Sequence, residues 1–137
     1  MDSTPPAPHP VIQTARYFLK IGEVVTRIAV LLSIVFALYL VAHLAPLAIR
    51  GEVGFREIAE NLLLISMNIV SAAVITVALD RWYVASRYKL LGFADLLAGA
   101  FTLVGAPLAG VLYIIGGLLI YVAAEMISIF KIEEKLV

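Results

Sequence analysis

The chain has 137 residues and a mass of 14.8 kDa; 63% of its residues are hydrophobic and only 15% are charged. Soluble domains average about 45–50% apolar and about 25% charged residues, and a chain this short has too little interior to hide so large an apolar excess from water. The composition excludes a soluble globular protein, the ten basic and ten acidic residues leave no net charge to attract nucleic acid, and the absence of cysteine excludes disulfides and thiolate chemistry.

The first fifteen residues contain four prolines, which disfavour a helix interior. We interpret residues 1–15 as a proline-rich tail and residues 16–137 as a single domain. Residues 11–27 show helical periodicity, with Ala15 and Leu19 on an apolar face and Arg16 and Lys20 on a charged face. Two interpretations are open: an amphipathic helix on the membrane surface, or a cytoplasmic extension of the first membrane span.

Four apolar stretches follow, and a membrane-spanning helix needs about 20 such residues. They are residues 28–49, 58–79, 90–106 and 108–130. Open strands cannot pair their backbone groups in lipid, so helices are expected. The sequence thus predicts an all-α integral membrane protein, a four-transmembrane-helix bundle with an N-terminal amphipathic helix. Because the third stretch is short and contains Asp95, a re-entrant hairpin formed by the third and fourth stretches is the alternative.

Basic residues set the expected orientation. With a cytoplasmic N-terminus, the inner segments hold eight of them and the outer segments two. The inner ones are Arg16, Lys20, Arg27, Arg81, Arg87, Lys89, Lys131 and Lys135, and the outer ones are Arg50 and Arg56. Cytoplasmic loops of membrane proteins carry such an excess of Lys and Arg. We therefore expect a protein of the plasma (inner) membrane with both termini in the cytoplasm.

The connection between the second and third spans combines aromatic and basic side chains. These are Arg81, Trp82, Tyr83, Arg87, Tyr88 and Lys89. Aromatic rings beside cations are typical of the lipid headgroup layer. We interpret these residues as an interfacial anchor, with specific binding of an anionic lipid as the alternative.

Small residues recur every seven positions in the third and fourth spans. They are Gly92, Gly99 and Ala106 in the third span and Gly110, Gly117 and Ala124 in the fourth. Small residues let helices pack closely in lipid. A hairpin in which the two indices of each facing pair sum to 216 would align these residues. That register places Asp95 opposite Tyr121, and predicts that Asp95 is either hydrogen-bonded to Tyr121 or protonated.

The remaining polar candidates within the membrane fall into two layers. An inner layer includes Asp95 and Glu125, and an outer layer includes His43, Glu60 and Asn61, with Asn68 between them. One interpretation is structural, with salt bridges and hydrogen bonds between helices, including one from His43 to Glu60. The alternative is a proton or ion path that runs from Asp95 and Glu125 to His43 and Glu60.

Several short pieces match a known family. Arg87-Tyr88 opens the third span, Pro107-Leu108 precedes Tyr113 near the last turn, His43-Leu44-Ala45 closes the first span, and the spacing from Phe55 to Tyr88 fits. With four spans and a basic second connection, the layout of residues 30–125 resembles the phosphate-starvation-inducible PsiE-like membrane proteins. The chain departs from that pattern because it lacks a mid-membrane glutamate in the second span and an arginine in the third. The resemblance implies an inner-membrane protein without an established activity.

No nucleotide-binding glycine pattern and no readable catalytic constellation occurs in the sequence, so we expect neither an enzyme nor a cofactor. We predict a non-catalytic membrane protein, an accessory or packing subunit of a homo-oligomer or of a larger membrane complex, with membrane lipids and other membrane subunits as partners and no nucleic acid. The alternatives are a small proton, ion or solute transporter subunit that uses Asp95 and Glu125, and an accessory subunit of a respiratory complex near quinone or haem.

Overall fold

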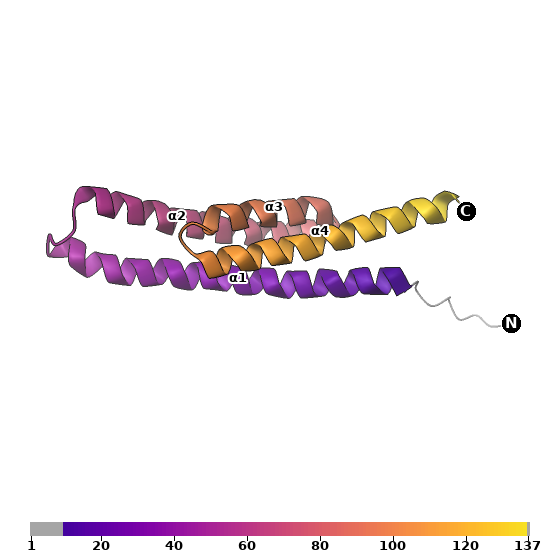
Figure 1. The fold of residues 1–137 in the computed structure, drawn as a ribbon, viewed down its shortest axis with the longest axis horizontal. Helices are drawn as coiled ribbons and strands as arrows, with labels where there is room; N and C mark the ends of the chain where they lie inside the picture. Colours follow the sequence, from indigo (N-terminus) through magenta and orange to yellow (C-terminus); the bar gives the residue numbers. More distant parts are fainter. Residues whose placement is uncertain (1–9, 137) are drawn as a thin grey trace.

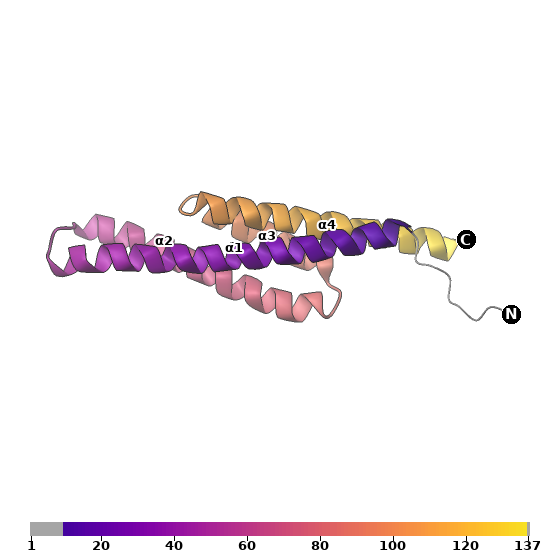
Figure 2. The same ribbon diagram turned by 90° about the horizontal axis from the view of Figure 1, so that it is seen from below.

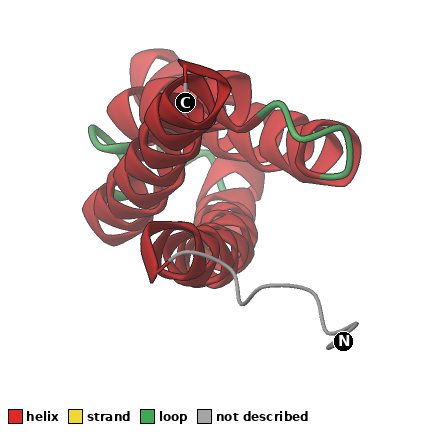
Figure 3. Ribbon diagram, turned by 90° about the vertical axis from the view of Figure 1, so that its right-hand side faces the viewer, coloured by secondary structure: helices red, strands yellow, loops and turns green. Residues whose placement is uncertain are grey.

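A computed structural model describes the backbone of residues 10–136 and the side chains of residues 10–129. In this part of the chain the elements are α1 (Pro10–Ile49), α2 (Phe55–Ala78), the π-helix η1 (Leu79–Tyr83), α3 (Tyr88–Thr102) and α4 (Pro107–Leu136). The fold is helical throughout, as the sequence predicts. The start of α1 and the end of α4 lie at the same end of the molecule (Figures 1 and 3).

The first helix is longer than expected. α1 is one continuous helix of 40 residues, about 60 Å long, which is twice the thickness of a bilayer's hydrocarbon core. The prediction of a separate amphipathic surface helix is therefore wrong, because residues 11–27 continue without a break into the first apolar stretch. Residues 10–15, which we assigned to the tail, also belong to α1, and the rest of the proline-rich tail lies outside the described residues.

Three helices of the described chain are long and apolar enough to cross a membrane. They are Pro10–Ile49, Phe55–Tyr83, which joins α2 to η1, and Pro107–Ile129 in α4. α3 has 15 residues and is only about 22 Å long. It is therefore shorter than the hydrocarbon core that a fourth span would have to cross.

The helices form two antiparallel hairpins of unequal reach (Figures 1 and 2). At the tip of the α3–α4 hairpin, Ala106 and Pro107 line a groove together with Leu32 and Tyr39 of α1. A Cβ added at Gly105 would be 2.6 Å from the side chain of Leu64 in α2. α1 continues for about ten residues, or about 15 Å, beyond Tyr39. The tip of the short hairpin thus ends beside the middle of the long one.

A stripe of mostly small buried residues joins α1 to α4. The α1 stripe is Ala15, Leu19, Gly22, Thr26, Ala29 and Ser33, and the α4 stripe is Ala109, Tyr113, Gly116, Ile120 and Ala123. Both alternate steps of three and four residues, the spacing of helices that wrap around each other with a left-handed twist. This packing holds the short hairpin against the inner half of α1.

Candidate functional site

Two adjacent glycines of α4 lie at the close helix contacts around the candidate site. Gly116 faces α1, where an added Cβ would be 2.3 Å from Oγ1 of Thr26, and Gly117 faces α3, where an added Cβ would be 3.0 Å from Cβ of Asp95. Because neither glycine has a side chain, α1 and α3 approach α4 closely on both sides. Thr26 and Asp95 can therefore meet at the junction of three helices.

The hairpin register differs from the predicted one. An added Cβ at Gly92 would meet Gly117 and Tyr121, and one at Gly99 would meet Gly110 and Ile114. The predicted pairs, Gly92 with Ala124 and Gly99 with Gly117, are therefore wrong by about one helical turn. The glycines do lie where the two helices touch, but Gly92 meets Gly117 and Gly99 meets Gly110, so the register that aligned Gly92 with Ala124 misplaces the pairs.

Asp95 is fully buried, and its partner is Thr26 rather than Tyr121. Oγ1 of Thr26 donates a hydrogen bond to Oδ2 of Asp95, and this bond links α1 to α3. Tyr121 is more than one-third exposed and takes no part in it. The predicted Asp95–Tyr121 pair depended on the wrong register. Oδ1 of Asp95 has no hydrogen-bond partner among the described residues.

Two more buried hydroxyls belong to the same region. Tyr113 of α4 is fully buried. Its phenol group lies near Ser33 of α1 and in the same region as Asp95 of α3. The hydroxyls of Ser33 and Tyr113 adjoin each other, but neither meets hydrogen-bond geometry with any described residue. Beside the Thr26–Asp95 bond lie two further buried hydroxyls, that of Tyr113 and, seven residues or about 10 Å farther along α1, that of Ser33, and the described chain leaves both unpaired.

Other buried polar side chains bond within their own helices. Asn68 donates from Nδ2 to the carbonyl of Leu64 at 2.9 Å, and Thr102 donates to the carbonyl of Ala98 at 2.8 Å. Asn61, which is half-buried, does the same with the carbonyl of Glu57. We expected such residues to bond across helices, and among the buried side chains of the described residues only Thr26 and Asp95 do so.

The residues of the predicted ion path lie apart. Nζ of Lys89 is 3.1 Å from a carboxylate oxygen of Glu125, so Glu125 pairs with a cation and not with Asp95. Glu60 pairs with Arg56 at 3.2 Å. His43 stacks on Tyr39 with ring centroids 6.1 Å apart, and among the described residues no hydrogen bond joins it to Glu60. Each of these groups has a neighbour on its own helix or at the surface.

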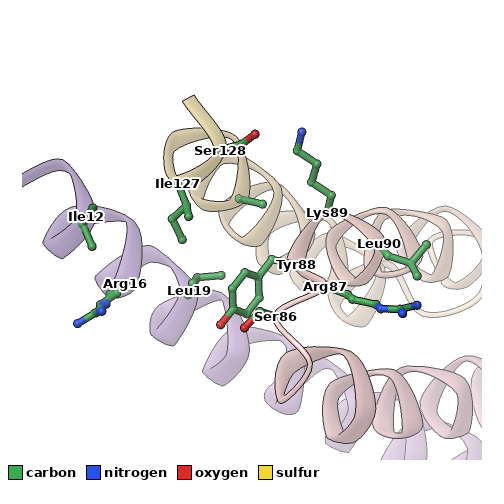
Figure 4. A pocket seen from close by; sticks show the side chains of 11 residues that line it. Ile12, Arg16, Leu19, Ser86, Arg87, Tyr88, Lys89, Leu90, Ile127 and Ser128 are labelled. Carbon is green, nitrogen blue, oxygen red and sulfur yellow. The ribbon is translucent and has the colours of Figure 1, made fainter. Parts of the chain in front are cut away.

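The inner end carries the aromatic and basic connection. A groove of about 640 Å³ lies there, with Leu19 and Ile127 among its apolar lining and Arg16, Arg87 and Lys89 at its rim. The charged ends of these three basic residues point in different directions (Figure 4). Nearby, the rings of Tyr83 and Tyr88 meet edge to face with centroids 5.6 Å apart. Arg81 and Trp82 border a second, apolar groove beside α2.

Sequence reasoning missed three residues of this region: Thr26, Tyr113 and Gly116. A usable signal was present. The alternating three- and four-residue spacing in α1 and in α4 marks the faces on which these residues lie. The seven-residue glycine pattern drew attention to the α3–α4 contact alone, whereas α4 also packs its other small face against α1.

No protein-family model, no curated protein and no solved structure matches this chain. The resemblance to PsiE-like proteins therefore stays a prediction. Among the described residues no group of three or more His, Cys, Asp and Glu side chains could hold a metal ion.

Proposed function

We propose that the chain is a non-catalytic membrane subunit that packs against copies of itself or against other subunits of a membrane complex. The observation that carries this proposal is the unequal reach of the two hairpins. Beyond the turn at residues 103–106, the outer halves of α1 and α2 have no third or fourth helix of the described residues beside them (Figure 1). A helix from a neighbouring subunit fits that space.

The proposed topology follows from the same mismatch. α1 and α2 cross the plasma (inner) membrane, and the α3–α4 hairpin enters from the cytoplasmic side and turns back within the bilayer. The length of α3 and the position of the hairpin tip beside Leu64 support this re-entrant arrangement over a fourth span. Both termini stay in the cytoplasm, in keeping with the excess of basic residues in the inner segments.

The side chains beyond the hairpin tip support a protein neighbour. Glu60 and Asn61 precede Leu64 by one helical turn and share its face of α2, and His43 follows Tyr39 by one turn on α1. Polar groups at this level are costly in contact with lipid tails. A second subunit would cover them and supply hydrogen-bond partners.

Photo-cross-linking in native membranes tests this proposal. A photoreactive amino acid at His43 should capture a second copy of the chain or one defined membrane protein. The matched control is the same amino acid at Leu38, which is also exposed but lies on a different face of α1. The proposal predicts a protein adduct at His43 and only lipid adducts at Leu38. Lipid adducts alone at both positions would contradict it.

The transporter alternative keeps one supporting observation, the fully buried carboxyl group of Asp95. The separation of Asp95 from the Lys89–Glu125 ion pair gives no support to a path that uses both acids. The respiratory alternative stays a prediction without a supporting contact among the described residues.

A further inference from the structure

We propose that Asp95, held by the hydroxyl group of Thr26, is a binding site inside the helix bundle for one monovalent cation, a proton or a sodium ion. This inference goes beyond the packing role and does not depend on it. It rests on the burial of the carboxyl group, on the absence of a compensating charge around it, and on the unpaired oxygen Oδ1 of that group.

The charge argument starts from burial. The exposed fraction of Asp95 is 0%. An ionised carboxylate in an apolar interior is costly unless a positive charge accompanies it. Arg27 pairs with Glu23 and Lys89 pairs with Glu125, both near the surface, and no described lysine or arginine pairs with Asp95. Asp95 therefore needs a positive charge that no neighbouring side chain of the described chain supplies.

The groups that face Asp95 are neutral. α1 contributes Thr26, and α4 contributes Gly117 and the phenol of Tyr113, while no described carboxylate, lysine or arginine touches the carboxyl group. A single carboxylate neutralises one positive charge. A divalent ion at this site would keep a net charge of +1 in the apolar interior, so a divalent ion does not fit. The site is thus matched to a monovalent cation.

The donor set points the same way. Asp95 and Thr26 offer oxygen atoms, which suit hard cations and protons rather than soft metals. Oγ1 of Thr26 fixes Oδ2 of Asp95, whereas Oδ1 of Asp95 and the hydroxyls of Ser33 and Tyr113 are buried without partners among the described residues. A proton on Oδ1 turns an unpaired acceptor into a donor, and a sodium ion would lie against the same Oδ1.

The site is closed toward the nearest groove. Asp95 lies seven residues, or about 10 Å, along α3 from Tyr88, which lines the groove at the inner end. Leu91 lies between them on the same face of α3 and is fully buried, and Leu19 of α1 is also buried. Exchange with the cytoplasmic side therefore requires these leucine side chains to move.

The experiment uses the purified full chain in lipid nanodiscs and compares it with Asp95→Asn. The matched control is Asp80→Asn, which changes the same group at an exposed position. Two readouts are recorded: the infrared carbonyl stretch of a protonated carboxylic acid, and the unfolding temperature between about pH 5 and about pH 9 in sodium or in choline at equal ionic strength.

A proton site predicts an infrared band that disappears in Asp95→Asn but not in Asp80→Asn. It also predicts an unfolding temperature that falls as pH rises, because the folded state then holds a proton that the unfolded state has released. A sodium site predicts that sodium raises the unfolding temperature of the parent, and that Asp95→Asn weakens the apparent sodium affinity by more than about tenfold.

The parent protein alone decides the matter if Asp95→Asn does not fold, since the band and the pH and sodium titrations need no variant. A parent that shows no carboxylic acid band and no response of its unfolding temperature to pH or sodium would overturn the proposal. A band or a pH or sodium response that persists unchanged in a folded Asp95→Asn variant would overturn it as well.

Discussion

At the scale of single residues, one hydrogen bond organises the interior. Thr26 and Asp95 are 69 positions apart in the chain and are both fully buried. A hydroxyl that donates to a carboxyl group satisfies one of its oxygens and ties α1 to the short hairpin. Hydrogen bonds between membrane helices contribute about 0.6–2 kcal/mol each, so this bond stabilises the junction without dominating its free energy.

Replacing Thr26 with valine tests that bond. Thr26→Val keeps the side-chain shape but removes the donor, and it should destabilise the protein by about 1–2 kcal/mol. The control is Thr76→Val, because Thr76 is exposed and its hydroxyl bonds only the carbonyl of Ala72 in its own helix. Unfolding of both variants in mild detergent measures the difference. Equal stabilities for the two variants would show that the bond to Asp95 contributes nothing.

The sequence identifies Asp95 as a costly intramembrane acid, because its charge and surroundings are local properties. Its partner could not be predicted, since that depends on how three helices are rotated against one another. Tyr121 was chosen from a two-helix register, and Thr26 comes from a third helix far away in the chain. The local sequence therefore predicts that Asp95 needs a partner, whereas the identity of that partner follows only from the tertiary structure.

At the scale of the helices, the glycine pair of α4 sets the distances. A Cβ at Gly116 would lie 2.3 Å from Oγ1 of Thr26, closer than van der Waals contact allows. Gly116→Ala must therefore push α1 away from α4 or rotate Thr26 off Asp95. Gly117 plays the corresponding part for α3, and the two neighbouring positions serve opposite faces of one helix.

Gly116→Ala should destabilise the bundle by about 1–3 kcal/mol, the usual cost of overpacking a tight interior. Gly54→Ala is the control, since an added Cβ there meets nothing within 4 Å and the backbone φ of −72° suits alanine. Thermal unfolding in detergent compares the two. A Gly116→Ala variant as stable as Gly54→Ala would show that α1 and α4 do not pack this closely.

Helix existence was largely predictable, and helix boundaries were less so. The apolar runs predict the helices because all but the third are long enough to span a membrane, and the end of the first stretch at Ile49 agrees with α1. The continuity of residues 10–27 with α1 could not be decided from their amphipathic pattern, because a surface helix and a helix packed against α4 share it. Burial of Ala15 and Leu19 distinguishes the two.

At the scale of the whole molecule, the two hairpins differ in reach. The α1–α2 hairpin is long enough to cross a bilayer, while the tip of the α3–α4 hairpin ends beside Leu64 and Tyr39. The hydropathy of the sequence identifies four apolar stretches, but it does not show how deeply each one enters the membrane relative to the others. Depth is a property of the packed bundle, which explains why the sequence left a fourth span and a re-entrant hairpin both open.

Labelling of single cysteines decides how the chain sits in the membrane, and the absence of native cysteine provides a clean background. The sites are Val53, in the turn between α1 and α2, Ser86, before α3, and Val104, which is 81% exposed at the tip of the short hairpin. Intact cells and inverted vesicles are treated with a maleimide that does not cross membranes. The re-entrant arrangement predicts labelling of Val53→Cys from outside, of Ser86→Cys from the cytoplasmic side, and of Val104→Cys from neither. Labelling of Val104→Cys from outside, together with Val53→Cys, would show that α3 crosses the membrane completely and would contradict the re-entrant arrangement.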